Sequence, residues 1–237
     1  MIRNRQTLAI TAIAIGIVVV ACNFLENTSR RVVSEHHYTI KSDTILQSLT
    51  NNEEGIFTPS DSDIGLENAY PDPISWNQSD YLKIANTFHR FIWKEPLDDW
   101  QLNSMSFTLL CNEVGNGFLQ ASFSYLRKNS SSQDSETEHQ IDIYPRRKLI
   151  NTWEFAYDSS FLKLTSTDQT KIKVAAEEAL MTAENNGGSE NRSAMNNDCE
   201  ISVGLSQNTV NQFEWKILYS PEIFSITVDP FTGRVIK

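Results

Sequence analysis

One order of sequence patterns occurs twice along the chain, and it limits the fold more than any other feature. A stretch with apolar residues at helical spacing comes first, and several segments with the apolar pattern of β-strands follow it. The first series begins near Ser79 and the second near Ser166. The sequence therefore predicts an α+β fold of two tandem αβββ units, each with one helix packed on an antiparallel sheet.

The two predicted helices have recognisable ends. The first is predicted over 79–94, with Ser79 as its N-cap. The second is predicted over 166–184, where Ser166 and Gln169 form a capping box, and the paired glycines 187–188 end it before a polar loop over 185–198. Helix and strand boundaries together place the two units at 73–162 and 163–237.

Both series close with a strand, a proline-containing turn and a second strand. The closing segments are 141–150 and 226–236. In the second segment, Asp229 and Pro230 are expected to start the turn, and Gly233 is expected to adopt a positive φ. An Asn-Gly pair at 116–117 predicts a further hairpin, between strands over 104–109 and 118–126.

The C-terminal unit, about 166–237, resembles the PepSY family. The resemblance is carried by the alanine-rich helix segment 174–180, the strand 215–219, and the ending 224–236 with its Asp-Pro-Phe-Thr-Gly turn. That family occurs in propeptides of secreted metallopeptidases and in secreted or membrane-associated bacterial proteins, and peptidase inhibition is proposed for it. The resemblance implies a non-catalytic binding or regulatory module, and it transfers no catalytic residue.

Residues 1–21 have the composition of a secretion signal. Two arginines precede an apolar run of 14 residues, which is shorter than the about 20 residues of a bilayer-spanning helix. The run ends in Val19-Val20-Ala21-Cys22, which resembles the lipobox of bacterial lipoproteins. The resemblance implies that Cys22 receives a diacylglyceryl group and becomes the mature N-terminus. An uncleaved signal-anchor and ordinary secretion are the alternatives.

The signal predicts the location of the protein and the role of the next segment. We expect an exported protein, anchored by its N-terminal lipid to a bacterial membrane and facing the periplasm or the cell exterior. Residues 22–72 are rich in Asn, Ser, Thr, Asp and Glu, which is typical of a polar tether. Apolar residues near 32–33 and 38–40 would allow a short strand within it.

The net charge of the chain indicates which kinds of partner it can bind. The whole chain has a formal charge of −10. Beyond residue 21 it holds 18 basic and 30 acidic residues, a formal −12. This balance argues against nucleic acid as a partner, because phosphate backbones are bound by clusters of Lys and Arg.

Two cysteines remain if Cys22 is acylated. Cys111 and Cys199 either form a disulfide, as an exported location would permit, or stay as two buried free thiols. The sequence leaves both alternatives open.

No catalytic or metal-binding motif stands out. The chain contains no HExxH, CxxC, GxSxG or P-loop sequence, so we expect no enzymatic activity, no metal and no cofactor. His89 is expected at the surface or boundary of its helix rather than as a ligand. The leading hypothesis is a membrane-anchored cell-envelope lipoprotein that binds a protein or peptide and, by its resemblance, regulates a peptidase. The alternatives are a structural or assembly component of an envelope complex, and an enzyme with an unrecognised site.

Overall fold

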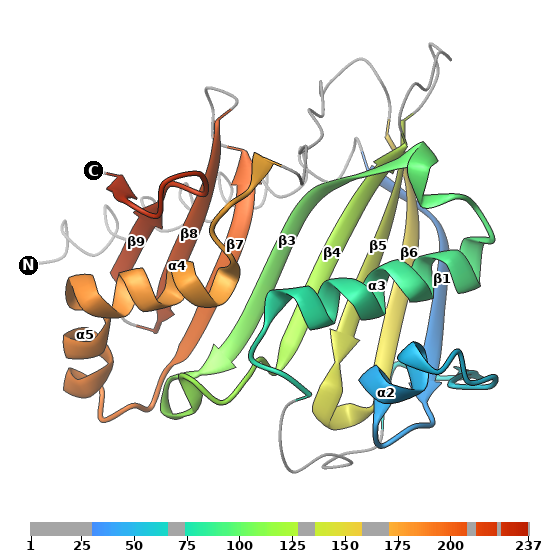
Figure 1. The fold of residues 1–237 in the computed structure, drawn as a ribbon, viewed down its shortest axis with the longest axis horizontal. Helices are drawn as coiled ribbons and strands as arrows, with labels where there is room; N and C mark the ends of the chain where they lie inside the picture. The colour runs from blue at the N-terminus through green and yellow to red at the C-terminus, as the bar shows by residue number, and fades with distance from the viewer. Residues whose placement is uncertain are drawn as a thin grey trace, which may run out of the picture.

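The centre of the protein is one antiparallel sheet of ten strands, in the order β10-β9-β8-β7-β3-β4-β5-β6-β1-β2 (Figure 1). The structure is a computed structural model that describes residues 30–65, 74–127, 136–157, 171–207, 212–221 and 224–236. The strands are β1 (Arg30–Ile40), β2 (Phe57–Ser60), β3 (Trp100–Leu110), β4 (Gln120–Arg127), β5 (Glu136–Tyr144), β6 (Leu149–Tyr157), β7 (Glu200–Gln207), β8 (Phe213–Ser220), β9 (Phe224–Val228) and β10 (Val235–Ile236). The helices are α2 (Ile45–Thr50), α3 (Gln78–Trp93), α4 (Ala176–Ala183) and α5 (Ser189–Ala194).

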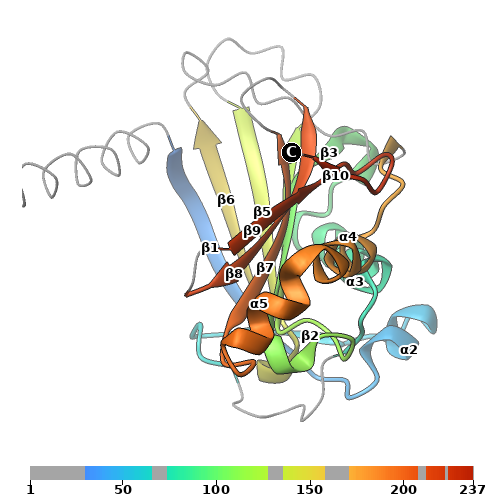
Figure 2. The same ribbon diagram turned by 90° about the vertical axis from the view of Figure 1, so that its left-hand side faces the viewer.

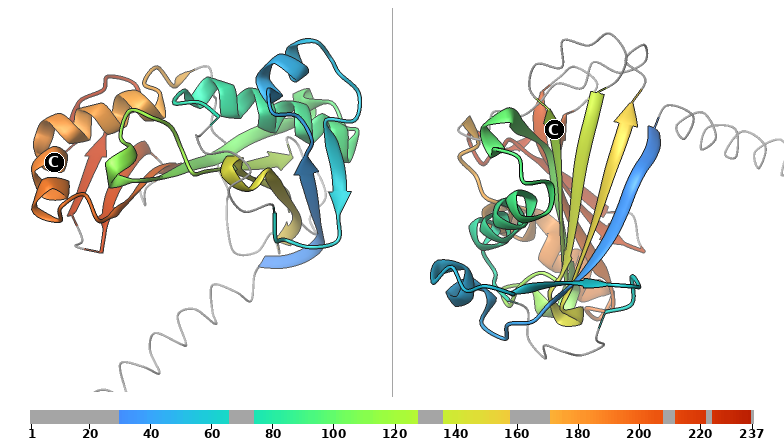
Figure 3. Two further views of the ribbon diagram at one scale, coloured as in Figure 1. Left: turned by 90° about the horizontal axis from the view of Figure 1, so that it is seen from below. Right: turned by 90° about the vertical axis from the view of Figure 1, so that its right-hand side faces the viewer.

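The helices lie on one side of the sheet (Figure 2). Helix α3 packs on β4 and β5, helix α4 packs on β7, β8 and β9, and α2 lies beside α3 at the β1 end (Figure 3). Strand residues alternate between the two faces, so one set of side chains meets the helices. In β3 this set includes Met105, Phe107 and Leu109, all of which are buried.

The prediction of two tandem αβββ units is wrong. Strand β7 pairs with β3 from Met105↔Leu205 to Leu110↔Glu200, which joins both series of strands into one sheet. Two separate sheets would each leave an edge strand with unpaired backbone N–H and C=O groups at this position, and the pairing satisfies them. The buried side chains of both series accordingly form one hydrophobic core.

The interpretation of 22–72 as a polar tether is wrong for residues 30–60, which form β1, α2, β2 and their connections. Strand β1 pairs with β6 along its length, and β2 pairs with the C-terminal end of β1. The short strand that the apolar residues allowed is thus an 11-residue strand of the sheet. Residues 1–29, with the signal and Cys22, lie outside the described residues.

Several local predictions are confirmed. Helix α3 is present where it was expected and β3 and β4 form the predicted hairpin, but the N-cap of α3 is Asn77 and not the predicted Ser79. At the C-terminal turn, Asp229 accepts hydrogen bonds from the amides of Phe231 and Thr232, and Gly233 has a φ of +71°. These features follow from short-range periodicity and turn chemistry.

The second helix differs from its prediction. The capping box at Ser166 and Gln169 lies outside the described residues, and the described helix α4 begins only at Ala176. The helix is interrupted at Gly187, whose φ is +107°. The chain then continues as α5, inside the segment expected to be a polar loop.

Candidate functional site

A groove runs between α2, the connection 51–56, β2 and α3. Its deeper part has a volume of 430 Å³ and is lined mainly by Leu49, Ile56, Phe57, Thr87 and Phe91. A shallower part of 680 Å³ continues along the exposed side of α3. It shares four residues with the first part: Leu49, Asn52, Thr87 and Phe91. We call the two parts together the α2–α3 groove.

The amphipathic pattern of α3 explains how Phe91 reaches the groove. The side chains of Tyr81, Ile84 and Phe88 point into the core and are fully buried. Phe91 comes three residues after Phe88, so it lies on the flank of that apolar stripe, towards α2. Its side chain is 47% exposed, which is unusual for a phenylalanine in contact with a core.

The base of the groove is a cluster of aromatic rings. The ring of Phe57 packs edge-on against Phe88 with centroids 4.6 Å apart, and it lies 5.5 Å from the ring of Phe91. Tyr38 of β1 contacts Phe88 and Phe91 at 5.1 and 6.1 Å. Because these rings brace one another from three elements, the apolar surface is preorganised.

The connection between α2 and β2 forms an acidic rim. Its turn is shaped by Asn52 and Gly55, which have φ angles of 53° and 74°. Glu53 and Glu54 line the deeper part of the groove and are exposed. Hydrogen bonds from Ser48 and Asn51 lower the pKa of Glu53, which keeps its carboxylate charged.

Basic side chains border the shallower part of the groove. Lys83 and Arg90 are exposed on α3 and line its shallower part. The Lys83 ammonium donates to the hydroxyl of Thr50 at 2.7 Å, and the guanidinium Nε of Arg90 donates to the carbonyl of Asn86 at 3.3 Å. The groove thus has an apolar floor, an acidic rim and a basic rim.

The face of the sheet opposite the helices has a different character. Its side chains on β4, β5 and β6 are mostly polar and bond to one another. Asp142 accepts hydrogen bonds from Ser122 at 2.6 Å and Gln140 at 3.0 Å, and burial raises the pKa of its carboxyl group. Arg30 lies over the ring of Phe155 and forms an ion pair with Glu138. These side chains satisfy each other, so we place the candidate site in the α2–α3 groove.

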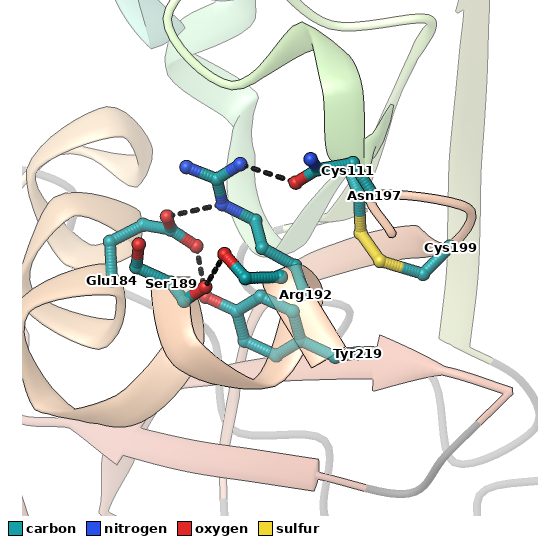
Figure 4. Close-up of a disulfide and its surroundings, with 8 residues drawn as sticks. Cys111, Glu184, Ser189, Arg192, Asn197, Cys199 and Tyr219 are labelled. Atoms are coloured by element: carbon teal, nitrogen blue, oxygen red, sulfur yellow. Dashed lines mark hydrogen bonds and ion pairs between the residues drawn. A yellow bond between two sulfur atoms is a disulfide. The ribbon is translucent and has the colours of Figure 1, made fainter. Parts of the chain in front are cut away.

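The residues singled out in the sequence lie elsewhere. Cys111 and Cys199 are joined by a disulfide, which connects the end of β3 to the residue before β7 (Figure 4). This is one of the two alternatives that the sequence left open. Cys22 lies outside the described residues. Sequence reasoning did not single out the groove, although Phe91, a large apolar residue next to the charged Arg90, was a signal for it.

His89 is not at the helix surface, contrary to expectation. It is fully buried, and its Nε2 lies 3.0 Å from Nδ1 of His139 on β5. The His139 ring is stacked between Trp93 and Trp100, with centroid distances of 3.8 and 3.7 Å. Among the described residues, no group of three or more His, Cys, Asp or Glu side chains is placed to hold a metal ion. Burial makes this pair part of the core.

Comparison with known proteins gives no relative. No protein-family model, curated protein sequence or solved structure matches the chain. Within the described ranges, no helix has both the length and the apolar character needed to cross a membrane.

Proposed function

We propose that this chain is an exported, lipid-anchored protein of a bacterial cell envelope that binds a protein or peptide segment without catalysing a reaction. The signal-like residues 1–21, the lipobox-like sequence before Cys22 and the PepSY resemblance of the C-terminal residues support this proposal. Regulation of a peptidase, which that resemblance implies, is one form such binding would take.

The observation that carries the binding part is the exposed ring of Phe91 over a preorganised apolar floor. Ligand pockets in proteins are concave, mostly apolar and largely pre-formed, with volumes of about 300–1,000 Å³. The deeper part of the α2–α3 groove, at 430 Å³, fits that description. Aromatic residues at the centre of an interface contribute a large share of binding energy.

The extent of β1 sharpens the anchoring proposal. Eight residue steps separate Cys22 from Arg30, the first residue of β1. A fully extended chain spans at most about 3.6 Å per residue, so a lipid on Cys22 would keep the start of β1 within about 29 Å of the membrane. The tether is therefore much shorter than the sequence suggested, and the partner must be reachable close to the membrane.

Binding is tested with purified mature protein and fluorescent nine-residue peptides that carry a central phenylalanine or leucine. We expect saturable binding by fluorescence anisotropy, and we expect Phe91→Ala to weaken it by about tenfold, as for a central aromatic contact. Met181→Ala is the matched control, because Met181 on α4 is similarly exposed, at 44%. Equal effects of the two substitutions, or no binding by any peptide, would contradict a binding role for the groove.

The anchoring part has a separate test. Mass spectrometry of the mature N-terminus should find a diacylglyceryl group on Cys22. An unmodified Cys22 or an intact Met1 would contradict lipid anchoring, and turnover of peptide or ester substrates by the pure protein would contradict the non-catalytic part.

A further inference from the structure

The charged side chains on the two rims of the α2–α3 groove have no ionic partners within the part of the chain that the structure describes. Neither Glu53 nor Glu54 has a cationic nitrogen within 4.0 Å, and the same holds for carboxylate oxygens around Lys83 and Arg90. Elsewhere an exposed charge does pair, as Asp43 does with the half-buried Lys148. The groove therefore presents an acidic rim on its deeper part and basic side chains along its shallower part.

We infer that the groove selects a segment whose apolar side chain lies between a basic residue and an acidic residue. The apolar side chain would cover Phe91 and fill the deeper part of the groove. The basic residue would meet the rim of Glu53 and Glu54, and the acidic residue would meet Lys83 and Arg90. This inference rests on the proposed function, because it names the kind of segment that the same groove binds.

Charge complementarity is the reason for proposing one basic and one acidic flank in the bound segment. An apolar segment with two basic flanks would bring a cation next to Lys83 and Arg90, and one with two acidic flanks would bring an anion next to Glu53 and Glu54. Like charges that face each other across an interface weaken binding, whereas complementary ones add selectivity. The hydrogen bonds to Glu53 hold the acidic rim in place without neutralising it.

The charges should contribute selectivity rather than most of the affinity. Ion pairs exposed to solvent are weak, so we expect each complementary charge on the peptide to raise the affinity by about threefold. The effect should fade as salt is raised from 0.01 to 1 M, because the screening length falls from about 30 Å to about 3 Å. The apolar contact with Phe91 should be largely insensitive to salt.

The test compares four kinds of peptide with a central phenylalanine on the mature protein. One kind has lysine and glutamate flanks in both orders, one has lysine and glutamine, one has glutamine and glutamate, and one has two glutamines. We expect the peptides with both charges to bind about tenfold more tightly than the peptide with none, and the two singly charged kinds to fall between.

Two charge-removing variants assign each preference to its rim. The double substitution Glu53→Gln and Glu54→Gln should abolish the gain in affinity from the peptide's lysine and leave the gain from its glutamate. The double substitution Lys83→Gln and Arg90→Gln should do the reverse. Glu190→Gln with Lys216→Gln removes two exposed charges outside the groove and should change neither preference. If all four peptides bind equally and Phe91→Ala still weakens binding, the charge inference is wrong and the proposed function stands. If no peptide binds, both fail.

Discussion

The two halves of the sheet bury their polar groups in opposite ways. In the N-terminal half, residues 30–157, the polar pair under the helix is His89 and His139, which burial keeps neutral. In the C-terminal half, residues 171–236, the corresponding group is the Glu184 carboxylate. It accepts a hydrogen bond from Tyr219 at 2.8 Å and forms an ion pair with Arg192 at 2.6 Å (Figure 4).

The difference follows from the helices that cover each half. Helix α3 has 16 residues and contributes large aromatic side chains to the core, whereas α4 has eight residues and buries mainly alanines and one leucine. A short, small-residue helix covers less apolar surface, and burial of apolar area supplies most of the stability of a fold. The C-terminal half therefore depends more on specific links, namely the Cys111–Cys199 disulfide and the ion pair of Glu184.

The largest expected effect comes from loss of the disulfide. We expect Cys111→Ala with Cys199→Ala to lower the free energy of unfolding by about 4 kcal/mol, because the bond closes a long loop between two cysteines with a sequence separation of 88. Urea unfolding measures the loss, and hydrogen exchange should show β7 to β9 opening before β4 to β6. Reductant should not change the urea midpoint of the double variant. An unchanged midpoint for the reduced wild-type protein would contradict the dependence on this link.

Loss of the ion pair between Glu184 and Arg192 should have the second largest effect on the free energy of unfolding. We expect Arg192→Leu to cost about 3 kcal/mol, because it leaves the buried Glu184 carboxylate without its cation. The estimate is at the low end for buried pairs, since the Arg192 side chain is 23% exposed. Combining it with Glu184→Gln should recover part of the loss in urea unfolding. Arg234→Leu, at an exposed arginine of the same half, is the control, and an equal loss there would remove the special role of the pair.

Acid should destabilise the N-terminal half before the C-terminal half. Burial lowers the pKa of His89 to about 4 and that of His139 to about 2, below the ordinary 6.5. The unfolded chain therefore binds more protons than the native chain below pH 6.5. Stability should fall as the pH drops from 6.5 towards 4, by up to about 1.4 kcal/mol per pH unit for each histidine.

Urea unfolding at pH 7, 6 and 5, followed by tryptophan fluorescence, measures this dependence. The double variant His89→Leu with His139→Phe should lose most of it, whereas His36→Gln, at an exposed histidine of β1, should keep it. A double variant with the same pH dependence as the wild type would show that other groups are responsible.

The sequence predicted the elements of both halves better than their connection. The strands from β3 to β9 and helix α3 are visible because periodicity of 2 or 3.6 residues is a local property. The pairing of β3 with β7 is not local, and the chain shows no pattern that distinguishes joined from separate sheets at this position. Strand β1 was mistaken for tether because charged residues such as Arg31 and Glu35 interrupt its alternation, although its pairing with β6 is extensive.

The candidate site was less predictable than the fold. The α2–α3 groove requires α2 and β2, which lie in the segment interpreted as a tether, to meet α3 at its C-terminal end. The disulfide was one of two alternatives because spacing alone does not give the distance between two cysteines. Residues that meet through tertiary contacts, such as Phe57 and Phe91, carry no common sequence signal.

The smallest expected effect concerns the contact between the two helices. The N-termini of α3 and α4 face each other (Figure 1), where the backbone amide of Gln78 donates to Glu177 at 3.1 Å and the amide of Ala176 donates to the side chain of Gln78 at 2.8 Å. Each side chain thus caps the helix of the other half. We expect Glu177→Ala to cost about 1 kcal/mol, as loss of a helix cap does.

Glu178→Ala is the matched control for this contact, because Glu178 caps only its own helix, through the amide of Ala175 at 2.9 Å. Its cost should be similar, so single variants do not separate local capping from coupling between the halves. Double-mutant cycles separate them, because residues of one hydrogen-bond network have non-additive effects. The two bonds at Gln78, one from its backbone amide and one to its side chain, hold the same two helix ends together. With Gln78→Ala, the Glu177 cycle should deviate from additivity by at least about 0.5 kcal/mol, whereas the Glu178 cycle should be additive. Additivity in both cycles would mean that the contact between α3 and α4 does not couple the two halves.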